Sequence, residues 1–485
     1  MAIYSELFTA GLAVIVIGFI IVWHLMKRWP TWNFPPGPIG IPFFGSILSL
    51  TPSVHYDFDR IRKKYGDIFS IMLGDSVIVA VNNVQLVKEI LRRTETSNRN
   101  FFWSQSQFSN PHKEGIFDQP YGDKWRTQRQ FALNTLRDFG FGKRCMEKQI
   151  AEEIKTLVSL LKEKDGELVD MKGLYGVSVS NIMCRLIFNK NYDHNDEEFI
   201  EIVDLVNQAL RIQGRAYDFI PLARVFQRKT IASDKKLWMS FYDFLTHEIK
   251  SHRQTYQVND NRDFIDAAIG QECIDPDNFS NECIKMNVTS LFIAGTETTS
   301  STLSWIILYM GLHPEIQEKV FLEIEKVVGS NRYPELNDQT EMPYTIAVIY
   351  EAQRIASVTP FVTRKTSETI SIGGYNLPNG TVFVANLWAV HHDEPTWKKP
   401  YDFVPERFLN RNGGVLMNEN LLAFGGGRRI CLGMSLAKME LFLFFTFLTQ
   451  HFKFDFPIGS LPPSLDGDLG LTLSNKPYKI RVTSR

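Results

Sequence analysis

Residues 424–433 read F-G-G-G-R-R-I-C-L-G and place a single cysteine, Cys431, shortly after a run of glycines. The apolar segment that follows, residues 434–447, is typical of a buried helix. Because glycine has no Cβ atom, the backbone ahead of Cys431 can adopt positive φ and let a flat group approach closely. Unpaired N–H groups and the dipole of the following helix would stabilise a thiolate there. The stretch therefore predicts that Cys431 is a metal ligand.

Arg429 and Cys431 together narrow the kind of metal centre. The planar guanidinium of Arg429 adds positive charge and can bind a carboxylate. Zinc needs three or four protein ligands close together, whereas haem iron takes its other donors from the porphyrin and needs one axial thiolate. The alternative is that Cys431 is a small buried apolar residue in a turn, which is the commoner fate of a lone cysteine.

The composition indicates one large domain with an extensive apolar core. The 485 residues include 36 phenylalanines, and aromatic residues make up 13% of the chain. A net charge of -1 without a long basic run argues against nucleic acid as a partner. The five cysteines are odd in number and form no C-x-x-C pair, which favours a reducing compartment over a disulfide framework.

The N-terminal region predicts a membrane anchor. Residues 7–26 are almost continuously apolar, and about 20 such residues span a bilayer. A cleaved signal peptide is the alternative, but Glu6 is the only charge before this run, while Lys27 and Arg28 follow it. The excess of basic residues on this flank places everything after Lys27 on the cytoplasmic side.

Local patterns set the expected boundaries of the remaining chain. The run Pro35-Pro36-Gly37-Pro38 cannot continue a helix and predicts a stiff hinge. Alternating apolar residues over 67–81 predict a β-hairpin that turns at Gly74-Asp75, and helical patterns dominate from there to Val328. The expected regions are an anchor over residues 1–28, a proline-rich hinge over 29–52 and a catalytic domain over 53–485.

A polar insert interrupts an apolar helical segment at residues 283–312. Its centre, from Ala294 to Thr302, reads A-G-T-E-T-T-S-S-T, which lowers helix propensity and favours a local bulge. Ala294 and Thr298 share one helix face, where a small side chain beside a hydroxyl leaves room for dioxygen. Glu297 lies on another face and could pass protons inward from solvent. The alternative is a stripe of threonines that satisfies backbone groups.

Two further spacings place side chains on shared helix faces. Trp125 and Arg129 are four residues apart, and Glu351 and Arg354 are three apart. Either pair is also common in ordinary amphipathic helices. Residues 97–120 predict an irregular loop rich in aromatic side chains, which either plugs the core surface or caps a pocket.

Taken together, these motifs resemble those of the cytochrome P-450 monooxygenases. The spacing F-x-x-G-x-R-x-C-x-G within residues 424–433 resembles the haem-binding signature of that family, and A-G-T-E-T resembles its oxygen-activation motif. W-x-x-x-R and E-x-x-R match two more family motifs in the expected order. The resemblance covers the chain from the hinge to Arg485 and points to microsomal members of the animal drug-, steroid- and hormone-metabolising group. It implies a mainly α fold with a small β-rich lobe, preceded by one N-terminal transmembrane helix.

The resemblance also implies a role for each motif residue. Cys431 would be the axial ligand of the haem iron, and Thr298 and Glu297 would be the catalytic residues. The other residues expected to contact the haem are Arg429, Trp125, Arg129, Arg364, Arg99, Phe424, Gly425 and Ala294. The candidate substrate pocket comprises Phe101, Phe102, Phe108, Phe117, Phe292 and Val362. A structural triad would be formed by Glu351, Arg354 and Arg407.

By the same resemblance, the expected function is hydroxylation or epoxidation of a lipophilic xenobiotic, steroid, fatty acid or terpenoid-like molecule. Haem b would be the cofactor, and electrons would come from NADPH through NADPH-cytochrome P-450 reductase, with cytochrome b5 as a second candidate donor. The expected location is the endoplasmic reticulum membrane, with one membrane pass and a cytoplasmic catalytic domain. Two other classes stay open: a haem-thiolate isomerase or dehydratase, which commonly lacks the threonine present here at Thr298, and a non-catalytic haem or lipid binder.

Overall fold

A computed structural model of the chain describes residues 11–12, 14–19, 22, 34–74, 76–100, 102–141, 144–212 and 214–485. No helix within these ranges is both long enough and apolar enough to cross a membrane. The anchor predicted over residues 7–26 lies partly outside the described residues and is not confirmed.

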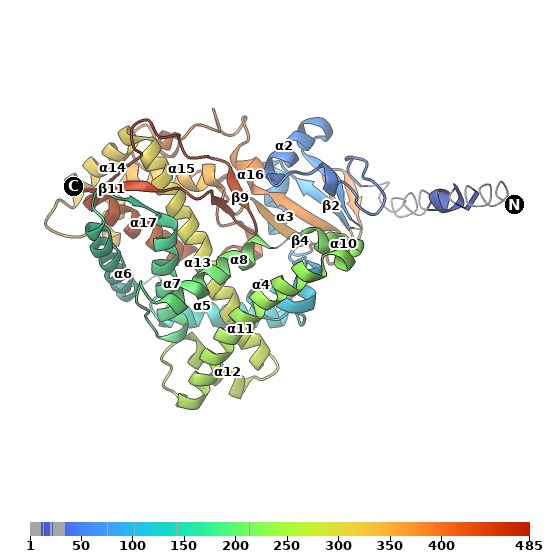
Figure 1. Cartoon of the computed structure of the whole chain (residues 1–485), viewed down its shortest axis with the longest axis horizontal. Coiled ribbons are helices and arrows are strands. Elements are labelled where there is room, and N and C mark those ends of the chain that lie inside the picture. The colour runs from blue at the N-terminus through green and yellow to red at the C-terminus, as the bar shows by residue number, and fades with distance from the viewer. Residues whose placement is uncertain are drawn as a thin grey trace.

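Helices dominate the described chain, and the strands form small sheets, as expected (Figure 1). The helices are α2 (Val54–Tyr65), α3 (Val84–Arg92), α4 (Gly115–Asp118), α5 (Asp123–Asp138), α6 (Arg144–Glu163), α7 (Met171–Phe188), α8 (Glu197–Arg211), α9 (Ala216–Phe219), α10 (Pro221–Phe226), α11 (Arg228–Thr255), α12 (Phe264–Ile274), α13 (Asn281–Leu312), α14 (Pro314–Val327), α15 (Pro343–Ala356), α16 (Leu387–His391) and α17 (Met434–His451). Short helical turns of 3-10 or π type are η2 (Ile47–Ser49), η3 (Gln105–Ser109), η4 (Leu336–Glu341), η5 (Pro405–Phe408) and η6 (Gly427–Arg429).

The strands make one four-stranded sheet and three smaller ones. They are β1 (Ile68–Leu73), β2 (Ser76–Val81), β3 (Leu168–Val169), β4 (Phe361–Lys365), β5 (Ile370–Ile372), β6 (Tyr375–Leu377), β7 (Val382–Asn386), β8 (Phe452–Asp455), β9 (Gly467–Leu469), β10 (Leu473–Asn475) and β11 (Ile480–Ser484). The largest sheet has the order β1-β2-β7-β4, and the others are β3-β11-β8, β5-β6 and β9-β10. In Figure 1 the four-stranded sheet lies with α2 and α3 at one end of the molecule, and most of the helices occupy the other end.

The β-hairpin predicted over residues 67–81 is confirmed. β1 and β2 are antiparallel, with Ile68 opposite Val81 and Leu73 opposite Ser76. Gly74, at the turn, has a φ of +56°. A Cβ atom there would lie 1.9 Å from the carbonyl oxygen of Phe219, so this position requires glycine and places α9 against the turn.

The described part of the predicted hinge packs against the hairpin. The N–H of Ser70 in β1 donates to the carbonyl oxygen of Pro36 (3.0 Å), and the N–H of Ser46 donates to that of Met72 (2.6 Å). From residue 34 onward the chain is therefore fixed to the sheet and belongs with the catalytic domain.

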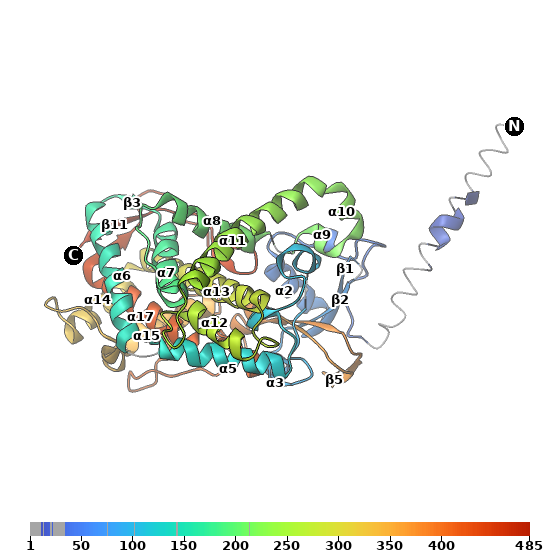
Figure 2. The ribbon, with the colours of Figure 1, turned by 90° about the horizontal axis from the view of Figure 1, so that it is seen from below.

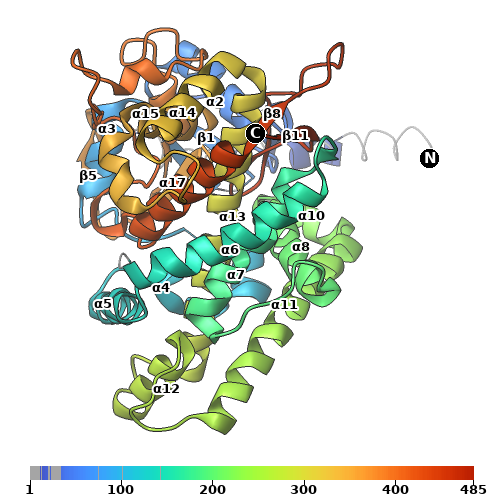
Figure 3. The ribbon, with the colours of Figure 1, turned by 90° about the vertical axis from the view of Figure 1, so that its left-hand side faces the viewer.

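The core is organised around α13. Its sequence is apolar on nearly all sides apart from the insert, which is typical of a helix enclosed by others. It packs against α4, α7, α15 and α17, and Figure 3 shows it between α17 and α7. Figure 2 shows α11 crossing the face of the molecule from α12 to α10. Any side chain that projects from the middle of α13 therefore lies deep in the molecule.

The predicted Glu351, Arg354 and Arg407 triad is assembled in the structure. Glu351 and Arg354 are fully buried and form two hydrogen bonds of 2.7 and 2.8 Å. Arg407 Nε donates to Glu351 Oε1 at 3.2 Å, and Arg354 also donates to the carbonyl oxygens of His391 (2.7 Å) and Pro400 (2.8 Å). The triad thereby ties α15 to the segment that leads toward η5.

We expect Arg354→Leu to lower the free energy of unfolding by about 3–5 kcal/mol, because it leaves the Glu351 carboxylate buried without its main partner. Urea titration followed by circular dichroism measures this loss. The control Lys63→Met removes an exposed ion pair with Asp59 and should cost less than about 1 kcal/mol. Losses of equal size in the two variants would contradict a structural role for the buried pair.

A second buried pair, between His252 and Asp263, predicts a pH dependence. His252 Nε2 lies 2.7 Å from Asp263 Oδ2, at the start of α12. Burial alone would lower the pKa of His252, but the hydrogen bond and charge of Asp263 outweigh it and raise the pKa above 6.5. A raised folded-state pKa gives a stabilisation that is fully present below the unfolded-state pKa and is lost as pH rises through the folded value.

The wild type should therefore melt at a higher temperature than His252→Gln. This difference in melting temperature should be largest below pH 6.5 and should narrow as the pH is raised above that value. His247→Gln, on the exposed face of the same helix, is the matched control and should show no such trend. A gap that is constant from pH 5 to pH 9 would contradict the raised pKa.

Candidate haem-binding site

Residues 424–433 form a tight loop directly ahead of α17. Gly425 and Gly427 have φ values of +68° and +67°. A Cβ atom on Gly427 would lie 1.7 Å from the carbonyl oxygen of Leu91, so this glycine lets the loop pack onto the end of α3. The N–H of Cys431 donates to the carbonyl oxygen of Phe424 (3.0 Å) and closes the loop. These contacts fix the position of the Cys431 backbone.

The electrostatic setting of Cys431 differs from the expectation. Its side chain is exposed, yet the surrounding protein desolvates the sulfur and raises the pKa of the thiol. A hydrogen bond from the N–H of Gly433 and the charge of Arg129 act in the opposite direction but do not offset the burial. In the free chain, burial therefore outweighs the stabilisation that the backbone N–H groups of the helix terminus were expected to give a thiolate. A bound metal ion, as the largest local charge, would deprotonate the thiol.

The middle of α13 is open although its flanks are buried. Phe292 and Ser301 are fully buried, whereas Ala294 is exposed and Thr298 is half-buried. Thr298 Oγ1 donates to the carbonyl oxygen of Ala294 (2.7 Å), so the two residues share one face as predicted. The helix is continuous over Asn281–Leu312, and the expected bulge is not present. Exposure in the middle of a core helix indicates an internal opening at this face.

The opening on α13 and the cysteine loop belong to one region of the fold. α17 begins three residues after Cys431 and packs against α13. Glu440 of α17 is hydrogen-bonded with Thr299, the neighbour of Thr298, and burial raises the pKa of Glu440 to about 8. Sequence reasoning missed Glu440 because it falls within an otherwise apolar helix.

Three arginine side chains gather beside the cysteine loop. Arg364 and Arg429 are buried, and the Nε atom of Arg99 is buried without a hydrogen-bond partner. Burial, together with the charge of neighbouring arginines, lowers the pKa of Arg99 to about 10 and that of Arg429 to about 9, and lowers the pKa of Arg364 well below its usual value. Asp118 opposes this repulsion at Arg99 and Arg429. The cluster is thus short of negative charge.

Arg429 links the cysteine loop to residues 97–120. Its guanidinium donates to the carbonyl oxygens of Ser97 (3.0 Å), Ile116 (3.2 Å) and Gln119 (2.5 Å). It also stacks 4.2 Å from the centre of the Trp125 ring. Residues 97–120 are therefore held in place by a side chain from the cysteine loop.

Trp125 and Arg129 lie on α5, next to this cluster. Trp125 Nε1 donates to the carbonyl oxygen of Ile116 (2.9 Å), and one Arg129 nitrogen donates to that of Ile430 (2.7 Å). Burial lowers the pKa of Arg129, and the charge of Cys431 raises it. In this structure the single side-chain N–H of Trp125 is already hydrogen-bonded to Ile116. Trp125 therefore contributes to the site through its ring, which stacks against Arg429.

The predicted pocket aromatics have different fates. Phe101 lies outside the described residues. Phe102 contacts Phe219 edge to face (5.6 Å between ring centres), and Phe117 lies under Arg99 (4.5 Å). Phe108 and Phe292 are buried in the main core, where Phe292 contacts rings of α7 and α11. Phe292 therefore contributes to the core and not to an open wall, which corrects the expectation for it. Val362, in β4, is partly buried against the smaller cluster around β2 and β7.

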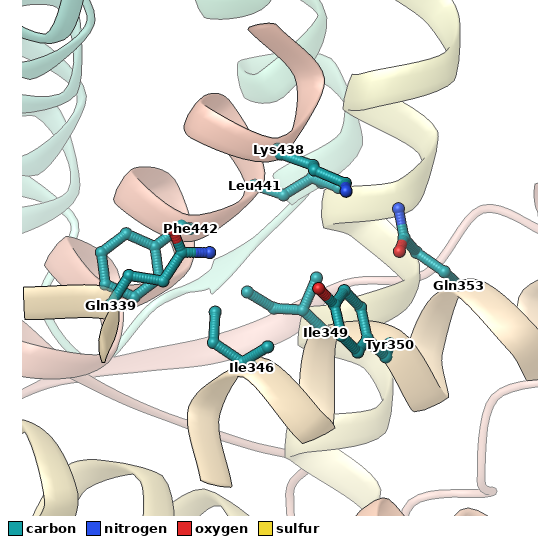
Figure 4. Close-up of a pocket in the computed structure, with 8 residues that line it drawn as sticks. All are labelled: Gln339, Ile346, Ile349, Tyr350, Gln353, Lys438, Leu441 and Phe442. Atoms are coloured by element: carbon teal, nitrogen blue, oxygen red, sulfur yellow. The ribbon is translucent and has the colours of Figure 1, made fainter. Parts of the chain in front are cut away.

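A small cavity between η4, α15 and α17 is shown in Figure 4. Its volume is about 10 Å³, which is room for a single water molecule at most. It lies against Tyr350 and Lys438 and is too small for an organic ligand.

Comparison with known proteins agrees with the geometry. The family model for cytochrome P450 matches residues 35–482. The chain is 36% identical over 489 residues to cytochrome P450 2D6 of Homo sapiens, which covers 98% of each chain. It is 36% identical over 491 residues to cytochrome P450 2J5 of Mus musculus, covering 99% of this chain and 97% of the other. The chain therefore belongs to the cytochrome P450 family and is a haem-dependent monooxygenase of the microsomal type.

Proposed function

We propose that this enzyme inserts one oxygen atom from dioxygen into a lipophilic small molecule, with haem b held by Cys431 and electrons supplied from NADPH through a separate reductase. The observation that carries the proposal is the pairing of an accessible cysteine sulfur with a cluster of buried, poorly neutralised arginines. Haem b would provide a partner for both features: its iron binds a cysteine thiolate, and its two propionate groups are carboxylates that can pair with the arginines.

The residues present fit the haem. Arg99 has a buried and unpaired Nε, and a propionate beside Arg364 would offset the burial and the neighbouring arginine charges that lower its pKa. Gly425 has open space where a Cβ atom would stand, so the backbone there leaves room for a flat ring. When bound, the haem supplies the iron and porphyrin chemistry that activates dioxygen.

The chain contributes positioning and proton handling. Ala294 keeps the opening on α13 clear, and Thr298 presents its hydroxyl at the same face. The Thr298 Oγ1–H now bonds to a carbonyl one turn back, and it can turn to donate to an oxygen atom placed at the opening. Glu297, one residue earlier, is the group able to take up and release protons there.

The substrate class follows from the lining. The residues predicted to line the pocket that are not fully buried, among them Phe102, Phe117 and Val362, are apolar, which favours an apolar ligand such as a xenobiotic, steroid, fatty acid or terpenoid. The presence of Thr298 argues against the isomerase or dehydratase alternative. A purely binding role for the haem or for a lipid would not need Glu297 buried next to this threonine.

We place the enzyme at the endoplasmic reticulum membrane, with one N-terminal pass and the catalytic domain in the cytoplasm. Exposed apolar residues support a membrane-facing end: Leu222, Val225 and Phe226 on α10 and Ile39 near the described start of the domain. The turn at Gly74 joins these segments, because it lies against Phe219 of α9, shortly before α10, and its N–H donates to the carbonyl oxygen of Phe44 (3.1 Å). Figure 1 shows α10 at the same end of the molecule as β2 and α2. NADPH-cytochrome P-450 reductase, and secondarily cytochrome b5, would deliver electrons from that membrane.

The first test is the axial ligand. In the dithionite-reduced wild type, carbon monoxide should produce a strongly red-shifted Soret band, and Cys431→Ser should lose it because a hydroxyl cannot replace the thiolate. Cys145→Ser, which removes an exposed cysteine of α6, is the control and should keep the band. A wild-type protein that binds haem without the band would overturn the thiolate assignment and the oxygenase proposal with it.

The second test concerns the arginine cluster. Arg364→Leu should speed haem loss about 10- to 100-fold, the equivalent of one charged hydrogen bond, because a propionate loses its partner. The haem-free variant should unfold at the same urea concentration as wild type or higher, because mutual repulsion in the cluster falls. Transfer of haem to an apoglobin measures the first effect.

Arg428→Leu is the matched control for the cluster, because Arg428 is exposed and adjacent to Arg429 in sequence. It should change neither haem loss nor unfolding. Equal rates of haem loss in the two variants would show that burial of the cluster is unrelated to haem.

A further inference from the structure

Glu440 is a fully buried carboxyl group with almost no polar surroundings. It is the only acidic residue of α17, and only 1% of its surface is exposed. Its Oε1 atom has no hydrogen-bond partner, and the hydroxyl of Thr299 on α13 is the one group that bonds to its side chain among the described residues. A single hydroxyl does not offset the cost of burying a carboxylate, so the neutral, protonated form is favoured.

No neighbouring charge compensates Glu440. α6, α13, α14, α15, η4 and β8 pack against α17, and no charged side chain that the structure describes on these elements alters the pKa of Glu440. The nearest charged residues along the two helices are directed elsewhere: Lys438 lies over the ring of Phe424 (5.9 Å), and Glu297 is bonded to Ser474 of β10 (2.8 Å). Burial therefore dominates and raises the pKa of Glu440 to about 8.

The contact with Glu440 sets Thr299 apart from its neighbours on α13. The hydroxyls of Thr298, Ser300 and Thr302 each donate to a carbonyl oxygen one turn back, at 2.7, 2.8 and 2.7 Å. The hydroxyl of Thr299 instead bonds across to the carboxyl group of α17. This bond joins α17 to α13 one residue away from Thr298.

Glu440 also lies on the helix that leads away from Cys431. α17 begins three residues after Cys431, and Glu440 is the seventh residue of the helix, about 9 Å along its axis from the first. Buried charges interact over such distances because little water screens them. At about 12 Å and an effective dielectric constant of about 20, a unit charge changes the proton affinity of another group about tenfold. The charge on Glu440 is therefore coupled to the charge on a group held by Cys431.

We propose that Glu440 is a positioning residue that works in its protonated form: its carboxyl group joins α17 to α13 through Thr299, and its neutrality keeps a buried negative charge away from the iron held by Cys431. One electron from the reductase adds one negative charge at the iron. An ionised Glu440 would oppose that electron, or would have to bind one proton from solvent to accommodate it. The inference rests on the proposed oxygenase function and adds to it a residue that sets how readily the enzyme is reduced.

The first test reads the protonation state of Glu440 directly. Infrared spectra of the holoenzyme between pH 6 and pH 10 report the carbonyl band of a protonated carboxyl group, and comparison with Glu440→Gln identifies the band of Glu440. We expect this band at pH 7 and its loss as the pH rises through about 8. Glu419→Gln, which removes an exposed carboxylate ahead of the cysteine loop, is the control and should keep the band. Absence of the band at pH 7 would overturn the inference.

The second test measures the reduction potential of the haem over the same pH range by spectroelectrochemical titration. Below pH 8 the difference in potential between wild type and Glu440→Gln should stay constant, because Glu440 is neutral. Above pH 8 the potential of wild type should fall relative to Glu440→Gln by about 59 mV, which corresponds to tenfold tighter proton binding in the reduced enzyme. Glu419→Gln should follow wild type. The same pH dependence in wild type and Glu440→Gln would contradict the proposed coupling.

Thr299→Val distinguishes the proposed bond from general damage to the core. The hydroxyl of Thr299 favours the ionised form of Glu440, so its removal should move both the loss of the infrared band and the fall in potential to higher pH. Ser300→Ala is the matched control, because it removes a neighbouring hydroxyl that bonds within α13, and it should move neither. A shift to lower pH in Thr299→Val would indicate entry of water and would contradict the bond. If Glu440→Gln does not fold, Thr299→Val decides the question against wild type.

The outcomes separate this inference from the proposed function. If wild type lacks the red-shifted carbon monoxide band, the oxygenase proposal fails, and the role of Glu440 toward the iron fails with it. If that band is present but the infrared band at pH 7 or the difference in potential above pH 8 is missing, only the inference about Glu440 fails.

Discussion

The site depends on the cost of burying positive charge. Arg99, Arg364 and Arg429 are desolvated together. Burial and the charges of Arg99 and Arg429 lower the pKa of Arg364, while Asp118 supplies the compensating charge at Arg99 and Arg429. Charges are retained in a protein interior only where something pairs with them. A bound dicarboxylate would add attractions that offset these repulsions. Under the proposed function, part of the affinity for haem would therefore come from relieving a cost that the free chain already carries.

The same cluster fixes the backbone around Cys431. Arg429 donates three hydrogen bonds to carbonyl oxygens of residues 97–120, which ties these residues to the cysteine loop. The close approach of Gly427 to Leu91 anchors the other side of the loop on α3. The backbone of Cys431 is thus held from two directions.

Sequence reasoning succeeded where the signal is local. The hairpin over 67–81, the shared face of Ala294 and Thr298 and the pairing of Glu351 with Arg354 all follow from spacings of two to four residues. It failed where the property comes from distant packing. The thiol pKa of Cys431 is set by desolvation, and the burial of Phe292 is set by rings on other helices. Neither property follows from the residues that are adjacent in the sequence. α13 is a regular helix because its tertiary contacts outweigh the weak helix propensity of its central residues.

The chain deals with buried charge in two opposite ways, and the difference separates the ligand site from the internal machinery. At Glu297 the fold supplies its own compensation, with hydroxyls from Ser301 and Ser474 and the ammonium of Lys172, some brought from far along the sequence. The Glu297 carboxylate is thereby held in place through its Oε1 atom by the protein's own groups. At the arginine cluster the fold supplies too little negative charge to balance the buried arginines. A group of cations left unsatisfied is suited to an external anion. The imbalance between the two sites is therefore consistent with an external ligand at the arginine cluster and with a structural fixing of the carboxylate at Glu297.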